Sequence, residues 1–186
     1  MAFVFDPYRP RPEWFAHDPA GIHGISHVGR VLVWAEQVAA WMQAQGRPVD
    51  LEVVRLAAVT HDVGRFDDGR DPEHGRRSAS WVRRHREALP VPLDEARVEA
   101  VAYCCTWHVP PDAHAPQMTN ELICLKDADA LDRVRIGDLD PRRLRTARAK
   151  QLPGAARRLL DASTRRRDGE PWERVRGAAL ALDLWR

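Results

Sequence analysis

An adjacent histidine and aspartate, His61 and Asp62, are the side chains of this sequence best suited to chemistry. They follow an apolar run at residues 56–60 and precede a turn at Val63-Gly64-Arg65. Such a pair can bind one cation, the imidazole through nitrogen and the carboxylate through oxygen. A histidine–aspartate dipeptide is common, however, so the pair alone does not identify a metal site.

Other residues with metal-binding side chains accompany this pair along the chain. They are His27, His74, His108 and an aspartate of the segment 126–132, each at or near the end of a stretch that reads as helix. One buried histidine is most often a hydrogen-bonded core residue. Four histidines and two carboxylates converging from five helices are costly to bury without compensation, and metal coordination satisfies such groups together. The sequence therefore predicts a metal site.

Helices are the elements predicted to position these residues. Apolar residues recur at helical spacing from about residue 26 to residue 45, and Gly46 and Pro48 end this helix. Four more helices follow, each opened by a capping or proline signal. These signals are Asp50, Asp71-Pro72, Asp94, and Thr119 or Asn120.

The carboxy-terminal part of the chain is also predicted to be helical. Pro141, Pro153 and Pro171 each mark a helix start. No alternating run with hairpin turns predicts a strand. The expected class is all-α, a single helical bundle of five helices around the site, with a basic helical extension.

Composition limits the kind of protein. At 186 residues and 44% hydrophobic, the chain fits one domain, residues 1–186, with a buried core. No apolar stretch approaches the ~20 residues that span a bilayer, so no membrane partner is expected. The amino-terminal segment lacks the pattern of a signal peptide, and three cysteines are too few for a disulfide framework. We therefore expect a reducing, cytoplasmic location.

Charge is unevenly distributed along the chain. Residues 1–132 carry 14 basic and 20 acidic side chains, whereas residues 133–186 carry 15 basic and 7 acidic ones. A basic tail of this kind can meet nucleic acid. A solvated helix surface is the favoured reading, because charge runs alone rarely identify a partner.

Two aspartates compete for the last ligand position. Asp127 and Asp129 are two residues apart, so on a helix they point in nearly opposite directions. Asp129 shares a face with Leu122 and Leu125, and Asp127 shares one with Ile123. Both faces carry apolar residues, and periodicity does not decide between the two acids.

The order and context of these residues resemble the HD-domain superfamily of metal-dependent phosphohydrolases, in the longer H…HD…H…H…D subset. The matching segments cover roughly residues 22–135, with the basic extension at about 136–186 outside them. No Gly-Tyr-Pro follows the site, which separates the chain from the cyclic-dinucleotide phosphodiesterases of that superfamily. The segments are His27-Val28-Gly29-Arg30-Val31, His61-Asp62-Val63-Gly64-Arg65, His74-Gly75-Arg76-Arg77-Ser78-Ala79, Thr106-Trp107-His108 and Ala128-Asp129-Ala130-Leu131-Asp132.

The resemblance selects Asp129 over Asp127 and implies a ligand set. It implies one or two divalent ions, with Fe, Mn, Co, Ni, Mg and Zn all open, and Asp62 bridging two of them. The implied reaction is hydrolysis of a nucleotide or other small phosphate ester by attack of a metal-bound hydroxide. The implied ligands are His27, His61, Asp62, His74, His108 and Asp129.

Other residues are candidates for binding the substrate. Arg65 and Lys126 are predicted phosphate clamps, with a salt-bridged structural role as the alternative. His23 and His114 are predicted to line the substrate pocket. The alternative for both is a loop histidine without a function in binding. Two other functions stay open: a di-iron oxygenase of the same fold, and a non-catalytic metal-binding module. Substrate and oligomeric state do not follow from the sequence.

Overall fold

The structure, a computed structural model, describes residues 5–184. Residues 1–4, part of the amino-terminal segment compared above with signal peptides, and residues 185–186 lie outside the described residues. Within the described part the chain forms eight α-helices, several short 3-10 helices and no β-strand. The predicted all-α class is therefore confirmed.

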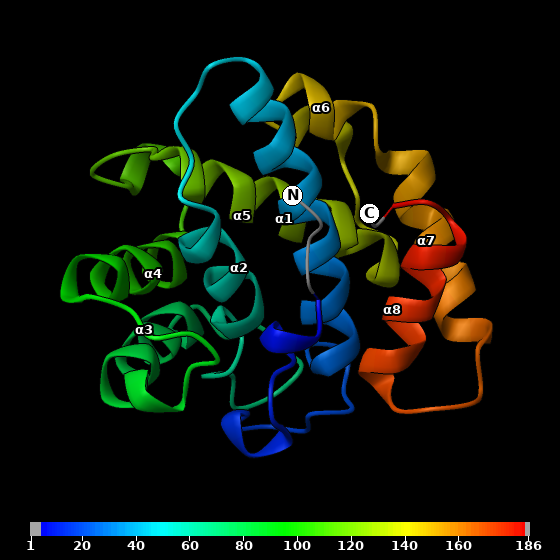
Figure 1. The fold of residues 1–186 in the computed structure, drawn as a ribbon, viewed down its shortest axis with the longest axis horizontal. Coiled ribbons are helices and arrows are strands. Elements are labelled where there is room, and N and C mark those ends of the chain that lie inside the picture. Colours follow the sequence, from blue (N-terminus) through cyan, green and yellow to red (C-terminus); the bar gives the residue numbers. More distant parts are fainter. Residues whose placement is uncertain (1–4, 185–186) are drawn as a thin grey trace.

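Five helices form the part of the fold that carries the site (Figure 1). They are α1 (Ile25–Ala44), α2 (Leu51–Thr60), α3 (His74–Arg84), α4 (Glu95–Trp107) and α5 (Asn120–Asp132). The carboxy-terminal part adds α6 (Ala147–Lys150), α7 (Pro153–Arg165) and α8 (Pro171–Ala181). The 3-10 helices are η1 (Asp6–Tyr8), η2 (Pro12–Trp14), η3 (Arg86–Ala88), η4 (Asp112–His114), η5 (Arg133–Ile136) and η6 (Pro141–Arg143).

Three of the predicted helix caps are confirmed. The Asp50 carboxylate accepts hydrogen bonds from the first-turn N–H groups of α2, and the Asp94 carboxylate accepts one from the first turn of α4. The Thr119 hydroxyl accepts one from the first turn of α5. Each satisfies a main-chain donor that has no partner inside the helix.

The predicted start of the third helix is wrong. We expected Asp71-Pro72 to open it, but α3 begins at His74 with Glu73 as its N-cap residue. The Asp71 carboxylate instead accepts a hydrogen bond from Phe66 N (3.2 Å) and pairs with Arg77. It therefore closes the loop before α3 and is not available as a cap.

The carboxy-terminal start signals give mixed results. Pro153 and Pro171 begin α7 and α8 as predicted, whereas Pro141 begins only the 3-10 helix η6. Asp140 caps this turn by accepting from Arg142 N, but the chain becomes extended at Leu144, so the turn is not continued as an α-helix.

Helix α1 lies at the centre of the fold (Figure 1), with α2, α3 and α4 on one side and α7 and α8 on the other. It packs against α5, α2 and α8. The contact with α8 is made at Gly29, where a Cβ would lie in ordinary contact, 3.4 Å from the fully buried ring of Trp172. The carboxy-terminal helices thus cover a face of α1 that would otherwise be exposed and apolar.

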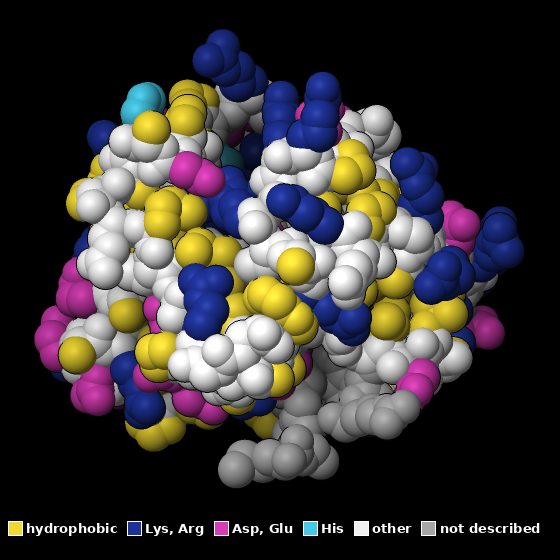
Figure 2. All heavy atoms as spheres, turned by 90° about the horizontal axis from the view of Figure 1, so that it is seen from above, with side chains coloured by type: hydrophobic (Ala, Val, Ile, Leu, Met, Phe, Trp, Pro, Cys, Tyr) yellow, Lys and Arg dark blue, Asp and Glu magenta, His cyan; other side chains and the backbone are white. Residues whose placement is uncertain are grey.

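Charge on the surface follows the asymmetry of the sequence. In Figure 2, Lys and Arg side chains are spread over the upper and right-hand parts of the face, while several acidic side chains gather at the left edge. Among the described helices, none is both long and apolar enough to cross a membrane.

Candidate metal centre

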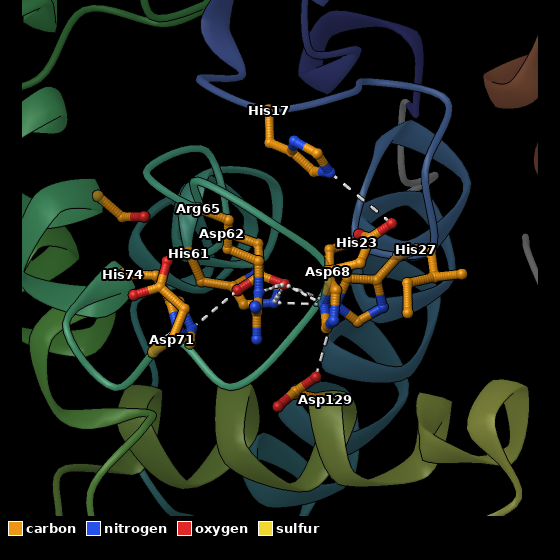
Figure 3. A network of polar contacts seen from close by, with 12 residues as sticks. His17, His23, His27, His61, Asp62, Arg65, Asp68, Asp71, His74 and Asp129 are labelled. Carbon is orange, nitrogen blue, oxygen red and sulfur yellow. Dashed lines mark hydrogen bonds and ion pairs between the residues drawn. The ribbon is translucent and has the colours of Figure 1, made fainter.

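The six predicted ligand residues lie together inside the bundle formed by α1–α5 (Figure 3). His27 is in the first turn of α1, and His74 is the first residue of α3. His61 and His108 are the C-cap residues of α2 and α4. Asp62 follows His61 in a turn, and Asp129 projects from α5. All are buried except Asp129, whose side chain is 28% exposed.

The cluster consists of two histidine pairs. Nε2 of His27 lies 3.2 Å from Nε2 of His61 and 3.5 Å from Oδ1 of Asp129. Nε2 of His74 lies 3.0 Å from Nε2 of His108. In each pair the two ring nitrogens that could bind an ion face each other.

Asp62 lies between the two pairs and directs one oxygen toward each. Its Oδ2 is 3.4 Å from Nε2 of His27 and 3.8 Å from Nε2 of His61. Its Oδ1 is 3.0 Å from Nε2 of His74 and 3.7 Å from Nε2 of His108. This carboxylate is therefore the group that connects the two pairs.

Close packing of α3 on α4 brings the second pair together. Gly75 follows His74, and a Cβ at this position would lie 2.4 Å from the main-chain oxygen of Cys105 and 3.3 Å from Cε1 of His108. The absence of a side chain lets the first turn of α3 approach the last turn of α4. Without this approach, His74 and His108 would be too far apart to share one ion.

Each of the four histidines uses Nδ1 for a hydrogen bond outside the cluster. Nδ1 of His27 donates to Oδ2 of Asp132 at 2.8 Å. The other three rings donate to the main-chain carbonyl three residues earlier in the chain. These acceptors are Ala58 for His61, Asp71 for His74 and Cys105 for His108.

These partners fix where the ring protons are. Carbonyl and carboxylate oxygens only accept hydrogen bonds, so each neutral ring carries its proton on Nδ1 and a lone pair on Nε2. Burial also lowers the pKa of His61 to about 3, which keeps this ring neutral at physiological pH. In the neutral ring, the facing Nε2 atom is therefore the one that carries a lone pair for a cation.

The carboxylates add further acceptors. Burial acts to raise the pKa of Asp62, but the neighbouring histidines, His61 first and then His108, His23 and His27, hold it well below its usual range. The pKa of Asp129 is also lowered, because His27 and His61 outweigh the effect of burial. A buried set of lone pairs and negative charges of this kind is stabilised by cations. The described residues thus contain histidine–aspartate clusters that could hold a metal.

Asp132 has a supporting role that the sequence analysis did not identify. Besides accepting from His27, it binds Nε of Arg30 at 2.6 Å and Nη2 of Arg30 at 3.1 Å. Arg30 and His27 overcome the effect of burial and hold the pKa of Asp132 at about 2. Arg30 therefore pairs with an acid and holds that acid against His27. Asp132 lies three residues after Asp129 on α5, a spacing that could have indicated the role.

The two competing aspartates of α5 have different surroundings. Asp127 is fully buried but accepts hydrogen bonds from the Thr146 hydroxyl (2.7 Å), Thr146 N (2.8 Å) and Arg145 N (2.8 Å). It anchors the chain leading to α6. The structure therefore brings Asp129, and not Asp127, to the cluster.

Two of the predicted substrate-binding residues contact the cluster. Nε of Arg65 lies 3.3 Å from Oδ2 of Asp62, while Nη1 of Arg65 donates to the main-chain oxygens of Asp67 (3.3 Å) and Gly69 (3.1 Å). Nδ1 of His23 lies 2.9 Å from the same Asp62 oxygen, and Nη2 of Arg135 is 3.0 Å from that nitrogen. Both side chains are therefore at the edge of the cluster (Figure 3).

The other two predicted substrate-binding residues have different partners. Lys126 is buried, and its Nζ donates to the main-chain oxygen of Pro110 at 2.6 Å and pairs with Asp112 at 2.9 Å. Burial lowers its pKa despite the nearby carboxylate of Asp112. His114 is exposed on η4, and no contact among the described residues joins it to the cluster. Neither side chain touches a cluster residue.

Comparison with known proteins identifies the family. Neither the curated proteins nor the solved structures compared with the chain gave a match. The family model of the HD domain matches residues 24–134, which is more than half of the chain and includes all six cluster residues. With the helical bundle and the histidine–aspartate cluster described above, this match shows that the chain belongs to the HD-domain family.

Proposed function

We propose that this protein is a metal-dependent phosphohydrolase that cleaves an ester or anhydride bond of a small phosphorylated substrate. One observation carries the proposal: four buried imidazoles, each held by a hydrogen bond at Nδ1, turn their Nε2 atoms toward each other and toward two ionised carboxylates. Members of the HD-domain family are mostly metal-dependent hydrolases, which supports the same reaction class.

The donor set fits two divalent ions. His27, His61 and Asp129 would hold one, and His74 and His108 the other, with one oxygen of Asp62 for each. Bound ions of this kind lower the pKa of a water molecule and neutralise charge on a phosphoryl group. Nitrogen and oxygen ligands suit several transition metals, and the chain's residues do not discriminate among Fe, Mn, Co, Ni and Zn.

The residues around the donors hold them in place. Asp132 and the three main-chain carbonyls bind the Nδ1–H groups, so each ring keeps one orientation and one tautomer. Partners of this kind make ligand nitrogens more basic and reduce the reorganisation required on binding. Arg30 in turn holds Asp132 through two hydrogen bonds.

Arg65 and His23 are proposed to contact the substrate. Arg65 uses Nε and Nη1 for the Asp62 carboxylate and the following loop, and its Nη2 has no hydrogen-bond partner among the described residues. A guanidinium in this position suits a phosphate oxygen beside the ions. The side chain of His23 is 13% exposed at the cluster edge, where it can reach a bound phosphate ester. Lys126 would contact phosphate only by giving up its hydrogen bond to Pro110 or its ion pair with Asp112.

Metal analysis combined with an activity panel tests this function. Protein purified without chelator should contain one to two equivalents of metal, and Asp62→Ala should lose it. Asp67→Ala, an acid of the neighbouring exposed loop, is the matched control and should retain both metal and activity. Removing His61 should abolish turnover and not merely raise KM.

The panel should include phosphate monoesters, diesters and anhydrides with Mn²⁺, Co²⁺, Ni²⁺ or Fe²⁺, each assayed with and without oxygen. Full activity in excess EDTA would contradict the proposal. Substrate loss that requires O₂ would assign the same ligand set to a di-iron oxygenase. Unchanged metal content in Asp62→Ala would reject the ligand assignment.

A further inference from the structure

A polar pocket separate from the metal cluster lies between the start of α1 and the carboxy-terminal helices. It has a volume of about 300 Å³, and three arginines from three different elements line it. Arg30 comes from α1, Arg135 from η5 and Arg174 from α8. We call it the arginine pocket. Its lining also includes the hydroxyl residues Ser26, Ser163 and Thr164, and contains none of the six residues of the metal cluster.

The arginine pocket carries excess positive charge. No Asp or Glu is among its lining residues. The nearest acid in contact is Asp132, which is shared by Arg30 at 2.6 Å and Arg135 at 3.6 Å and also accepts from His27. One carboxylate therefore serves two guanidinium groups, and the third, on Arg174, adds to the excess.

Arg174 is the arginine of the pocket whose guanidinium has no partner among the described residues. Its guanidinium makes no hydrogen bond or ion pair with residues 5–184, and its Nε is buried without an acceptor. Arg30 uses Nε and Nη2 for Asp132, which leaves its Nη1 available to a ligand in the pocket. Burying guanidinium donors without acceptors is costly, and an anion with several oxygens removes that cost.

The amino-terminal end of α1 adds an electrostatic field that favours an anion in the pocket. Ser26 lies in the first turn of this 20-residue helix, and the N-cap residue Gly24 offers no side-chain acceptor to the first-turn N–H groups. The amino-terminal end of a helix carries partial positive charge and favours anions. The hydroxyl of Thr164 on α7 also lines the pocket and can donate to the same oxygens, whereas the Ser163 hydroxyl donates to the main-chain oxygen of Leu160 at 3.0 Å.

We infer that the arginine pocket binds a phosphate group distinct from the one at the metal cluster. Guanidinium groups that enclose a site from several sides match the tetrahedral oxygens of phosphate. The phosphate can come from two sources, a separate small phosphorylated molecule or the far end of the substrate itself. The pocket borders the cluster, because Arg135 contacts His23, and Arg30 contacts the Asp132 that orients His27.

Binding of inorganic phosphate to the full-length protein, measured by calorimetry, tests the pocket. Arg174→Gln should weaken binding about tenfold or more, as expected for loss of one charge-assisted contact. Arg157→Gln is the matched control, because it removes the same charge from an exposed position on α7. It should leave the dissociation constant within about twofold of the wild-type value.

A second pair of variants tests the pocket even if the Arg174→Gln variant does not fold. Thr164 is exposed at the pocket rim, so Thr164→Glu and Thr164→Gln differ only in charge. The glutamate variant should lose phosphate binding, and the glutamine variant should retain it. Equal binding by these two variants, or no phosphate binding by the wild-type protein, would overturn the inference.

The same measurement in an Asp62→Ala background separates this pocket from the metal site. Phosphate should still bind when the cluster is disabled, whatever the outcome of the metal and activity assays. Loss of binding in that background would place the phosphate at the cluster and reject the arginine pocket.

Turnover assays then identify the source of the phosphate. If it belongs to the substrate, Arg174→Gln should lower kcat/KM for bisphosphorylated esters and not for monophosphorylated ones. A separate ligand leaves the ratio between the two substrates unchanged. The ratio identifies only the source of the phosphate, and the calorimetric tests above decide whether the pocket binds it.

Discussion

Replacing Gly75 with alanine should separate the two halves of the candidate metal centre. A Cβ added at Gly75 would lie 2.4 Å from the main-chain oxygen of Cys105, where ordinary contacts are 3.4–4 Å. The neighbouring atom belongs to the backbone of α4, so it cannot rotate away. Helices α3 and α4 must therefore move apart by about 1 Å, and His74 must move away from His108.

The sign of the stability change distinguishes this effect from helix propensity. Glycine to alanine in a helix interior normally stabilises by roughly 0.5–1 kcal/mol. Overpacking costs about 1–3 kcal/mol, so Gly75→Ala should be destabilising by roughly 1–2 kcal/mol. For a chain of this length that lowers the melting temperature by roughly 2–8 °C. Gly154→Ala on α7 is the control, because the nearest atom to its Cβ is the end of the Arg158 side chain at 3.6 Å.

Differential scanning calorimetry and elemental analysis measure the two consequences. Gly154→Ala should melt at or above the wild-type temperature and keep its metal. Gly75→Ala should melt lower and lose the ion assigned to His74 and His108 before the one assigned to His27 and His61. Equal melting temperatures for the two variants would refute the argument from close helix packing. A lower melting temperature with unchanged metal content would refute only the ligand assignment.

Three further predictions concern Arg65, Asp132 and His61. Arg65→Ala should keep its metal and lower kcat/KM about 10- to 100-fold, with partial recovery in Arg65→Lys; a lower melting temperature with near-normal kinetics would assign Arg65 to the loop instead. The pKa of Asp132 is held at about 2 against an ordinary 3.8. Its ionised carboxylate therefore adds roughly 2 kcal/mol to the free energy of unfolding above about pH 4, and this contribution is lost as the pH falls through 2. The stability difference between wild type and Asp132→Asn in urea should therefore shrink over that range, and a constant difference would contradict the assignment. Burial lowers the pKa of His61 from 6.5 to about 3, so the unfolded chain gains a proton that the folded one does not. Chelated protein should then lose stability between pH 6.5 and pH 3, which urea unfolding measures, and His61→Gln should weaken this dependence.

Much of the fold was predictable because its signals are local. Helix starts at Asp50, Asp94 and Thr119 follow from side chains that bond to main-chain groups two or three residues away. The failure at Asp71 has a non-local cause. Its carboxylate is bound by Arg77 and by the Phe66 N–H group, and a loop closure of this kind competes with capping for the same oxygen atoms.

The competition between Asp127 and Asp129 could not be settled from periodicity for a similar reason. Both faces of α5 are buried, one against the cluster and the other against the chain at Arg145 and Thr146. Only the position of that later segment distinguishes a carboxylate that anchors the chain before α6 from one that reaches His27. The resemblance to a known family supplied this distinction, which the residue pattern did not contain.

The placement of the histidines at helix ends has a physical cause. The last carbonyls of a helix have no partner within it. His61 and His108 stand one residue beyond the ends of α2 and α4, and each ring donates Nδ1–H to such a carbonyl three residues back, on Ala58 and Cys105. The bond satisfies the helix end and, at the same time, turns Nε2 toward the cluster.

A histidine whose preceding main-chain carbonyl is already occupied needs a separate side chain to fix its orientation. His27, in the first turn of α1, is that case, because the carbonyl of Gly24 three residues earlier accepts from Val28 N. Its ring is held by Asp132, which is held in turn by Arg30. The orientation of His27 is therefore the one most sensitive to side-chain substitutions. Arg30 also lines the arginine pocket, so a phosphate bound there would contact the residues that orient the first of the proposed ligands.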